Sequence, residues 1–191
     1  MSSKKKTTRQ NILDISSELF MDKGFQATST RQIAERAGIT QPNLYYHFKT
    51  KEAIYIAVLE DLSKVVREQL ELIIQEDNQL LEEKLLHVIH FLKEKHPVNL
   101  FIMRHDINNE MSKENHQFLY QLWRQSYLQP LIDLFTQYIK DDALFNAVEL
   151  AMHFYGNISP YIQKSEGNHE TLRPDQLVHL FVYGIIDRKD T

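Results

Sequence analysis

The chain has 191 residues and a formal net charge of -4 at neutral pH, and it contains no cysteine. This length suffices for a small module plus a body with its own core, while disulfides, thiolate metal sites and cysteine nucleophiles are excluded. No stretch approaches the roughly 20 apolar residues of a membrane span, and no signal-peptide core follows the basic start, so we expect a cytoplasmic protein without membrane contact.

Apolar residues recur at three- and four-residue spacing, and only five glycines and five prolines interrupt them. Because sustained alternating runs of Val, Ile and Thr are lacking, the pattern predicts an all-α protein. The first helix is expected from about Thr8 to Met21, and Asp22-Lys23-Gly24 should end it with a glycine at positive φ. Its expected buried stripe is Ile12, Ile15, Leu19 and Phe20.

Two short helices are expected next, at about Thr30 to Ala37 and Gln41 to Phe48. Ser29 can cap the first of them, and Gln32 stands at the spacing that completes a capping box. The segment Gly38-Ile39-Thr40 then joins the two helices and supplies the next N-cap. This arrangement is typical of a helix-turn-helix with a glycine in its turn.

Longer helices are expected at about 52–75, 79–95, 98–107, 113–139, 142–163 and 174–187. Pro130 should kink or split the helix in which it lies, because proline removes a backbone donor and clashes with the preceding turn. We therefore expect two domains, a helix-turn-helix module over residues 1–51 and a helical sensing and dimerisation domain over residues 52–191.

The second short helix presents side chains suited to reading DNA. Once the apolar packing positions are set aside, its outward residues are Gln41, Pro42, Asn43, Tyr45, Tyr46 and His47. Such side chains can hydrogen-bond base edges, touch a thymine methyl or reach phosphate oxygens. A helix that enters the major groove N-terminus first would bring residues 41–43 deepest, and Tyr45 and His47 would lie nearer the backbone. The alternative for either tyrosine is packing alone.

Three residues at the starts of helices in this region could contact phosphate. Thr30 and Arg31 open the first short helix, where free N–H groups favour an anion and Arg31 could also reach a guanine edge. Lys51 begins the next long helix, where its ammonium could bind a phosphate. The alternative is a solvated surface lysine. Nine of the 22 basic and four of the 26 acidic residues lie in residues 1–51, so this segment carries +5 and the remainder -9. This asymmetry favours a DNA-binding head on an acidic body.

Residues Gly24-Phe25, Ser29 to Thr40 and Asn43 to Glu52 together resemble the N-terminal signature of the TetR/AcrR family of bacterial repressors. The run from Gln41 to His47 is similar to the recognition helix of the tetracycline repressor. The resemblance covers about 50 of the 191 residues. It implies an Ω-shaped homodimer with nine or ten helices per chain, and each head would enter one half-site of a palindromic operator. The candidate DNA-binding residues are Ser29, Thr30, Arg31, Gln41, Pro42, Asn43, Tyr45, Tyr46, His47 and Lys51.

The same resemblance implies that the last two helices form a four-helix bundle across the dimer axis. Apolar stripes at helical spacing occur in both. The candidate interface residues are Leu144, Val148, Ala151, Ile158, Ile162, Leu177, Leu180, Phe181, Gly184 and Ile185. Burial of these stripes against their own chain is the alternative.

Residues 86–161 are rich in aromatic residues, methionine and histidine, the side chains that line small-molecule pockets and equally those of an ordinary core. The candidate ligand-binding residues are His90, Phe101, Met103, His105, Trp123, Tyr127, Met152 and Tyr155. His87 and His90 lie one helical turn apart, but no third ligand is evident from spacing, so we expect neither a metal nor a cofactor.

The function expected from the sequence is that of a transcriptional repressor that an unidentified small molecule releases from its palindromic DNA operator. The alternative is a DNA-binding regulator whose body is a protein-interaction module without a small ligand. An enzyme is not expected, because the sequence has no glycine-rich phosphate loop, nucleophile elbow or metalloprotease motif.

Overall fold

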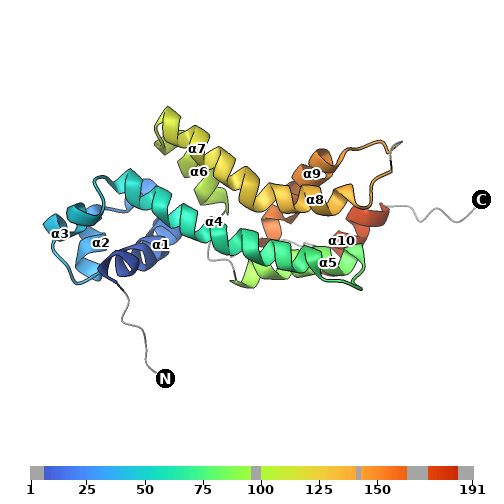
Figure 1. The fold of residues 1–191 in the computed structure, drawn as a ribbon, viewed down its shortest axis with the longest axis horizontal. Helices are drawn as coiled ribbons and strands as arrows, with labels where there is room; N and C mark the ends of the chain where they lie inside the picture. Colours follow the sequence, from blue (N-terminus) through green and yellow to red (C-terminus); the bar gives the residue numbers. More distant parts are fainter. Residues whose placement is uncertain (1–6, 96–99, 141–142, 163–171, 185–191) are drawn as a thin grey trace, which may run out of the picture. The chain divides into compact units, whose positions relative to one another are not determined.

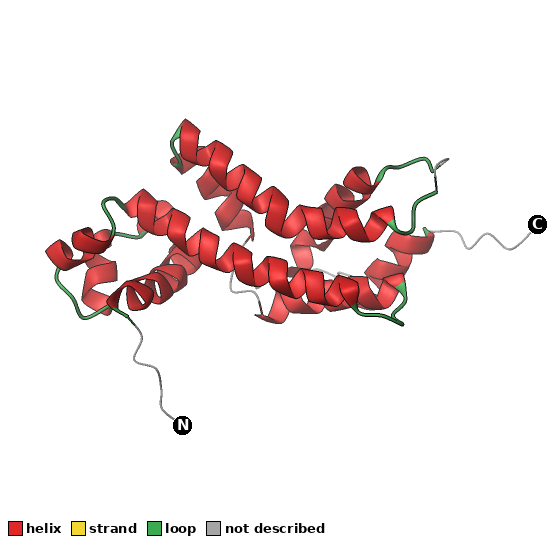
Figure 2. Ribbon diagram, viewed as in Figure 1, coloured by secondary structure: helices red, strands yellow, loops and turns green. Residues whose placement is uncertain are grey.

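The computed structural model describes residues 7–95, 100–140, 143–162 and 172–184, with only the backbone described at residues 95, 100–102, 104 and 160. Every regular element in these ranges is helical, so the predicted all-α fold is confirmed (Figures 1 and 2). In chain order the elements are α1 (Thr8–Ala27), α2 (Thr30–Arg36), α3 (Gln41–His47), α4 (Lys51–Gln75), α5 (Leu81–His90), the π-helical η1 (Phe91–Lys95), α6 (Leu100–Glu110), α7 (Lys113–Trp123), the π-helical η2 (Arg124–Leu128), α8 (Gln129–Thr136), α9 (Ala147–Ile162) and α10 (Pro174–Tyr183).

The first helix breaks at Gly24 but does not end there. Gly24 has φ 81° and ψ 173°, a backbone conformation that glycine adopts without strain, and one further turn follows up to Ala27. The predicted positive φ at Gly24 is therefore confirmed, and the turn that follows it was not predicted. Side-chain hydrogen bonds close this turn: the hydroxyl of the buried Thr28 donates to the carbonyl oxygens of Gly24 at 2.8 Å and Leu19 at 3.2 Å.

The helix-turn-helix is built as its sequence signals predict. The hydroxyl of Ser29 accepts from the Gln32 amide at 3.2 Å, and the Gln32 side chain accepts from the Ser29 amide at 3.0 Å, which completes the capping box. Gly38 turns the chain with φ 67°, and the Thr40 hydroxyl caps α3 by accepting from the Asn43 amide at 3.4 Å. Local caps thus set the start of both helices.

The chain divides into two compact units, and the first contains residues 1–64 and 97–122. It combines α1 to α3 and the start of α4 with α6 and most of α7 (Figure 1). Its core includes the fully buried Ile12, Phe20, Ile33, Leu44 and Tyr55. Helix α6 packs on α1, so residues distant in the sequence support the helix-turn-helix.

The second unit contains residues 65–96 and 123–191, and its described helices are the end of α4, α5, η1, η2, α8, α9 and α10. The rings of Phe135, Phe154 and Phe181 meet in its core, with centroids 5.3 to 6.3 Å apart. Lys84 is buried, and its ammonium donates to the Ile74 carbonyl at 2.6 Å, which ties α5 to the last turn of α4. The unit therefore has its own apolar core.

Pro130 disturbs its helix as predicted. The helix from Lys113 to Thr136 changes to π-helical hydrogen bonding in η2, where the Gln129 amide donates to the Arg124 carbonyl, directly before Pro130 in α8. A proline lacks the amide that would continue the regular ladder. In the same segment the Tyr127 carbonyl accepts a hydrogen bond of 2.8 Å from the Tyr155 hydroxyl on α9.

Several predicted boundaries move. The 79–95 helix begins at Leu81 and becomes π-helical from Phe91, and the 174–187 helix ends at Tyr183 because Gly184 has φ 79°. Residues 185–187 of that prediction lie outside the described residues. None of the described helices has the length and apolar character needed to cross a membrane.

Candidate nucleic-acid interface

Helix α3 buries one side chain and exposes the residues predicted to read DNA. Leu44 is fully buried, whereas Gln41, Pro42 and Asn43 are exposed at the first turn. Tyr46 is 79% exposed, and its ring lies edge to face against that of the half-buried His47, with centroids 5.3 Å apart. The polar face of a capped helix is thus free for a partner.

Thr30 joins the start of α2 to both ends of α3. Its hydroxyl lies 3.0 Å from the phenol oxygen of Tyr45, and the Gln41 amide donates to the same hydroxyl at 3.5 Å. These bonds restrict two exposed side chains before any partner arrives. A side chain that is already ordered loses less entropy on binding.

The arginines of α2 are paired across exposed surface. Arg31 contacts Glu35 at 2.9 Å and Arg36 contacts Glu18 at 2.8 Å, and all four side chains are more than half exposed. Such pairs contribute little free energy in water, so a phosphate or a base could replace Glu35 as the partner of Arg31. Ser29, by contrast, already uses its side chain to cap α2.

Lys51 lies over the turn that follows Gly24, and it is half-buried, unlike the solvated lysine that was the alternative. Its ammonium donates to the carbonyl oxygens of Phe25 at 2.7 Å and Thr28 at 3.0 Å, and it lies 4.1 Å from the centroid of the Phe25 ring. Burial lowers the pKa of Lys51, while the nearby charges of Glu110 and Asp106 oppose that shift. Two of its three N–H groups are occupied by the protein itself, which leaves one for a phosphate.

Asp106 on α6 is a residue of this region that the sequence analysis missed. One carboxylate oxygen accepts hydrogen bonds from the Phe25 amide at 2.9 Å and from the Tyr55 hydroxyl at 3.2 Å, and the residue is only 4% exposed. Burial, followed by the charge of Asp106, raises the pKa of Tyr55. The sequence does contain a signal for this residue, because Asp106 is an acidic residue within the apolar stripe that Met103 and Ile107 form.

The candidate ligand residues are distributed over both units. Trp123, Tyr127 and Tyr155 lie together, with the Trp123 ring centroid 6.4 Å from that of Tyr155. In the same unit Met152 and His90 are exposed. In the first unit Met103 is buried, His105 is exposed beside Asp106, and the side chain of Phe101 lies outside the described residues. The described side chains include no cluster of three or more potential metal ligands.

The candidate dimer residues divide by exposure. Ala151, Ile158, Ile162 and Leu177 are buried within their own unit, and Leu180 and Phe181 are partly buried. Leu144, Val148 and Gly184 are exposed, and Ile185 lies outside the described residues. Two further apolar residues that were not predicted to form an interface are exposed: Met152 on α9, and Phe145 in the segment before it.

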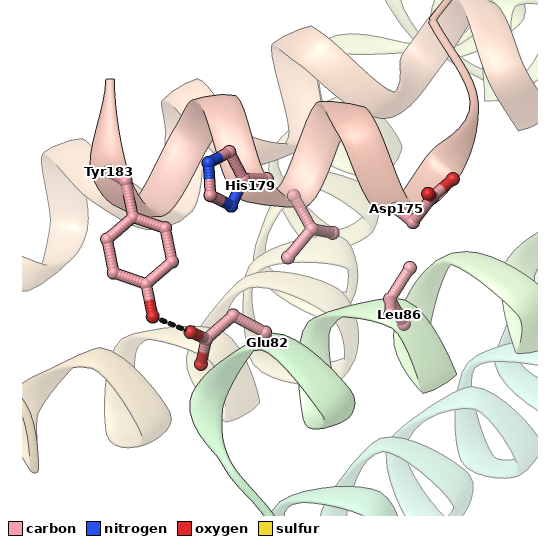
Figure 3. A pocket seen from close by; sticks show the side chains of 6 residues that line it. Glu82, Leu86, Asp175, His179 and Tyr183 are labelled. Atoms are coloured by element: carbon pink, nitrogen blue, oxygen red, sulfur yellow. Dashed lines mark hydrogen bonds between the residues drawn. The ribbon is translucent and has the colours of Figure 1, made fainter. Parts of the chain in front are cut away.

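An open groove between α5 and α10 has a volume of about 500 Å³ (Figure 3). Leu86 and Val178 supply apolar walls, and the polar lining residues are Glu82, Asp175, His179 and Tyr183. The Tyr183 hydroxyl donates to Glu82, which raises the pKa of Tyr183. No sequence pattern indicates this groove, because its two walls lie about 90 residues apart in the chain.

Residues 12–58 match the model of the family described as bacterial regulatory proteins, tetR family. The chain is similar to the transcriptional activator FasR of Mycolicibacterium smegmatis, with 44% identity over 52 residues, which is 27% of this chain and 24% of FasR. It is also similar to the regulator AcrR of Shigella flexneri, with 38% identity over 87 residues, or 43% of this chain and 40% of AcrR. The chain thus spans between a quarter and two fifths of the length of these curated relatives.

The fold likeness extends over nearly the whole chain. The structure of FadR from Bacillus subtilis in complex with stearoyl-CoA superposes with a TM-score of 0.73 at 20% identity, over 93% of this chain and 99% of FadR. That of AibR in complex with isovaleryl coenzyme A and operator DNA gives a TM-score of 0.71 at 20% identity, over 95% and 99%. At this identity the likeness concerns the fold alone. The capped helix-turn-helix and the family match together show that residues 12–58 form a DNA-binding-type segment of the kind found in the tetR family of bacterial regulatory proteins.

Proposed function

We propose that this protein is a transcriptional regulator that binds a palindromic DNA operator as a homodimer and is released by a small molecule. The observation that carries the DNA-binding part is the exposed polar face of α3, which Thr30 restrains through Tyr45 and Gln41. This face belongs to the segment of the chain that carries the net charge of +5. Base-reading side chains on a basic module are the features of major-groove recognition.

Each candidate DNA-binding residue has a role in this proposal. Residues 41–43 enter the groove, Tyr45, Tyr46 and His47 contact flanking bases or backbone, and Arg31 exchanges Glu35 for a guanine or a phosphate. Ser29 and Thr30 offer the N-terminal end of α2 to a phosphate. Lys51 would reach a phosphate with its remaining N–H group.

A second copy of the chain is supported by the exposed face of α9. Val148 and Met152 lie one turn apart on α9, Leu144 and Phe145 lie in the segment before it, and all four are more than 40% exposed. Contiguous exposed apolar side chains of this kind mark interaction surfaces. A two-fold dimer presents two identical heads, and for that reason the operator is expected to be palindromic.

The effector is proposed by analogy of fold and by the groove between α5 and α10. FadR and AibR, which share the fold, are seen with acyl-CoA thioesters, so stearoyl-CoA and isovaleryl-CoA are the first compounds to test. The groove, with Glu82 and Tyr183 at its wall, is large enough for a small molecule. The alternative, a body that binds a protein partner without a small ligand, predicts that neither compound changes stability or DNA binding.

Selection of duplexes from a random 30-base-pair pool tests the DNA-binding proposal, with length chosen to hold two half-sites about one helical turn apart. We expect an enriched inverted repeat, which Asn43→Ala and Tyr46→Ala variants bind more weakly while remaining folded. Lys64→Ala, at an exposed position of α4, is the matched surface control. Enrichment of no sequence would contradict the proposal.

Reciprocal titrations test the effector. If ligand binding and DNA binding are coupled, a compound that weakens operator binding must itself bind more weakly, by the same factor, in the presence of operator. Thermal shifts identify candidate compounds first, because a ligand of the folded state raises its stability by mass action. Equal ligand affinity with and without operator would rule out ligand-induced release.

A further inference from the structure

We propose that Asp106 is a positioning residue for the DNA-reading helices: its buried carboxylate fixes the irregular turn that leads from α1 into α2. This inference rests on the proposed DNA-binding function and adds a residue that lies outside the helix-turn-helix. Neither the family match over residues 12–58 nor the candidate contact residues include it.

One oxygen of Asp106 joins three helices. It accepts from the amide of Phe25, which directly follows the break at Gly24 in α1, and from the hydroxyl of Tyr55 on α4. The donor-to-acceptor distances are 2.9 and 3.2 Å, and the residue itself comes from α6. Because Asp106 is 4% exposed, water has little access to replace it as the acceptor.

The same turn is held from its other side by Lys51. While Asp106 receives the amide of Phe25, the ammonium of Lys51 donates to the carbonyl oxygens of Phe25 and Thr28. The rings of Phe25 and Tyr55 also pack edge to face, with centroids 5.3 Å apart. The turn is therefore held by opposite charges, from α6 and from α4, through its amide and carbonyl groups respectively.

This turn ends at the residue before Ser29, which caps α2. Its geometry therefore sets how α2, and with it α3, leaves α1. In an Asp106→Ala variant the Phe25 amide and the Tyr55 hydroxyl would lose their buried acceptor, a state that costs free energy. The turn would then sample other conformations, and the face of α3 would no longer be held in one orientation.

Whether DNA affinity rises or falls in variants of Asp106 distinguishes a positioning role of this residue from an effect of its charge. Asp106 is an anion, so removal of its charge alone should strengthen binding to the phosphate backbone. Positioning predicts the opposite result for Asp106→Ala. Asp106→Asn removes the charge but retains a carbonyl oxygen that can accept both bonds. Glu110→Ala is the matched control, because it removes the same charge one turn along α6, where Glu110 bonds the exposed Gln26 at 2.9 Å.

The first measurement is the affinity of each purified full-length variant for the duplex that the unaltered chain selects, at one fixed salt concentration. We expect Asp106→Ala to bind about tenfold more weakly, and Asp106→Asn and Glu110→Ala to bind within about twofold of the unaltered chain or more tightly. If Asp106→Ala bound as tightly as Glu110→Ala, or if Asp106→Asn bound as weakly as Asp106→Ala, the assignment would be overturned.

The second measurement uses no DNA and follows backbone amide hydrogen exchange across residues 25–30. We expect faster exchange in Asp106→Ala and unchanged exchange in Asp106→Asn and Glu110→Ala. Should Asp106→Ala fail to fold, Tyr55→Phe, which removes one donor and keeps the ring, must weaken DNA binding by a smaller factor. Exchange that matches the unaltered chain in Asp106→Ala would refute the proposal. If the unaltered chain selected no duplex, the proposed function would fail, while exchange would still decide whether Asp106 fixes the turn.

Discussion

The hydroxyl of Thr30 and the phenol of Tyr45 lie 3.0 Å apart and connect the first residue of α2 to the outer face of α3. Both belong to the exposed surface of the helix-turn-helix, yet neither side chain is free to rotate without breaking the bond. The Gln41 amide approaches the same hydroxyl at 3.5 Å. Part of the face proposed to read DNA is thus arranged by hydrogen bonds within the protein itself.

Replacement of either partner should weaken DNA binding more than it weakens folding. For Thr30→Val and for Tyr45→Phe we expect a loss of about fivefold in operator affinity, the equivalent of about 1 kcal/mol for one hydrogen bond. The free energy of unfolding should change by less than about 0.5 kcal/mol, because the bond is exposed. Affinity titrations and urea unfolding measure the two quantities.

The double variant distinguishes the bond from separate DNA contacts. If both residues act through their mutual bond, the losses in the double variant are smaller than the sum of the single losses. Strict additivity would mean that each residue contacts DNA independently of the other.

Lys51→Ala should affect both stability and DNA binding. Loss of the hydrogen bonds to Phe25 and Thr28 is expected to lower the free energy of unfolding by about 1–2 kcal/mol. If the third N–H group meets a phosphate, affinity falls about evenly across sequences, and the slope of log affinity against log salt decreases by roughly one. Lys49→Ala, at an exposed neighbouring position, should leave stability unchanged. An unchanged salt slope in Lys51→Ala would show that this lysine serves the turn alone.

Glu52 should make stability depend on pH in the acid range. A hydrogen bond from Asn115 lowers the pKa of Glu52 below its ordinary value of 4.5, burial opposes this shift, and the Ser112 amide, which donates at 2.9 Å, adds to it. A carboxyl with a lowered pKa in the folded state stabilises the fold above its unfolded pKa, and this contribution is lost as pH falls through the folded pKa. The contribution should therefore be complete near neutrality and decline below pH 4.5.

Comparison with Glu52→Gln isolates that contribution. The variant should be less stable than the unaltered chain near neutral pH, and the difference should shrink as the pH falls below 4.5. Glu68→Gln, at an exposed position of the same helix, is the control for removal of a carboxylate. A difference that stays constant across this range in thermal unfolding would mean that ionisation of Glu52 does not stabilise the fold.

The helix-turn-helix could be predicted because its signals are local. The capping box at Ser29, the glycine turn at Gly38 and the Thr40 cap each involve residues no more than three or four positions apart, and the structure confirms all three. Helix period and the break before Pro130 are local in the same sense. The ends of helices were predicted less well, because long-range hydrogen bonds with Asp106 and Lys51 hold the extra turn of α1 beyond Gly24.

The contacts that support the site could not be predicted in the same way. The Phe25 amide and Asp106 are 81 residues apart, and no periodic pattern identifies such a pair. Lys51 was assigned to phosphate from its position at a helix start, but the sequence does not show that Phe25 and Thr28 present their carbonyl oxygens there. The groove between α5 and α10 depends likewise on long-range packing.

Ser16 offers a test of the core of the first unit. Its side chain is fully buried on α1, and its hydroxyl has no hydrogen-bond partner, so folding removes this group from water without compensation. Ser16→Ala should therefore raise the free energy of unfolding by about 1–2 kcal/mol and the melting temperature by about 2–6 °C. Ser17→Ala, at the neighbouring half-buried position, reports the gain of about 0.5 kcal/mol that alanine brings through helix propensity alone. An equal gain in the two variants would show that the Ser16 hydroxyl carries no desolvation cost, whereas a larger gain for Ser16→Ala assigns the excess to the unpaired buried group.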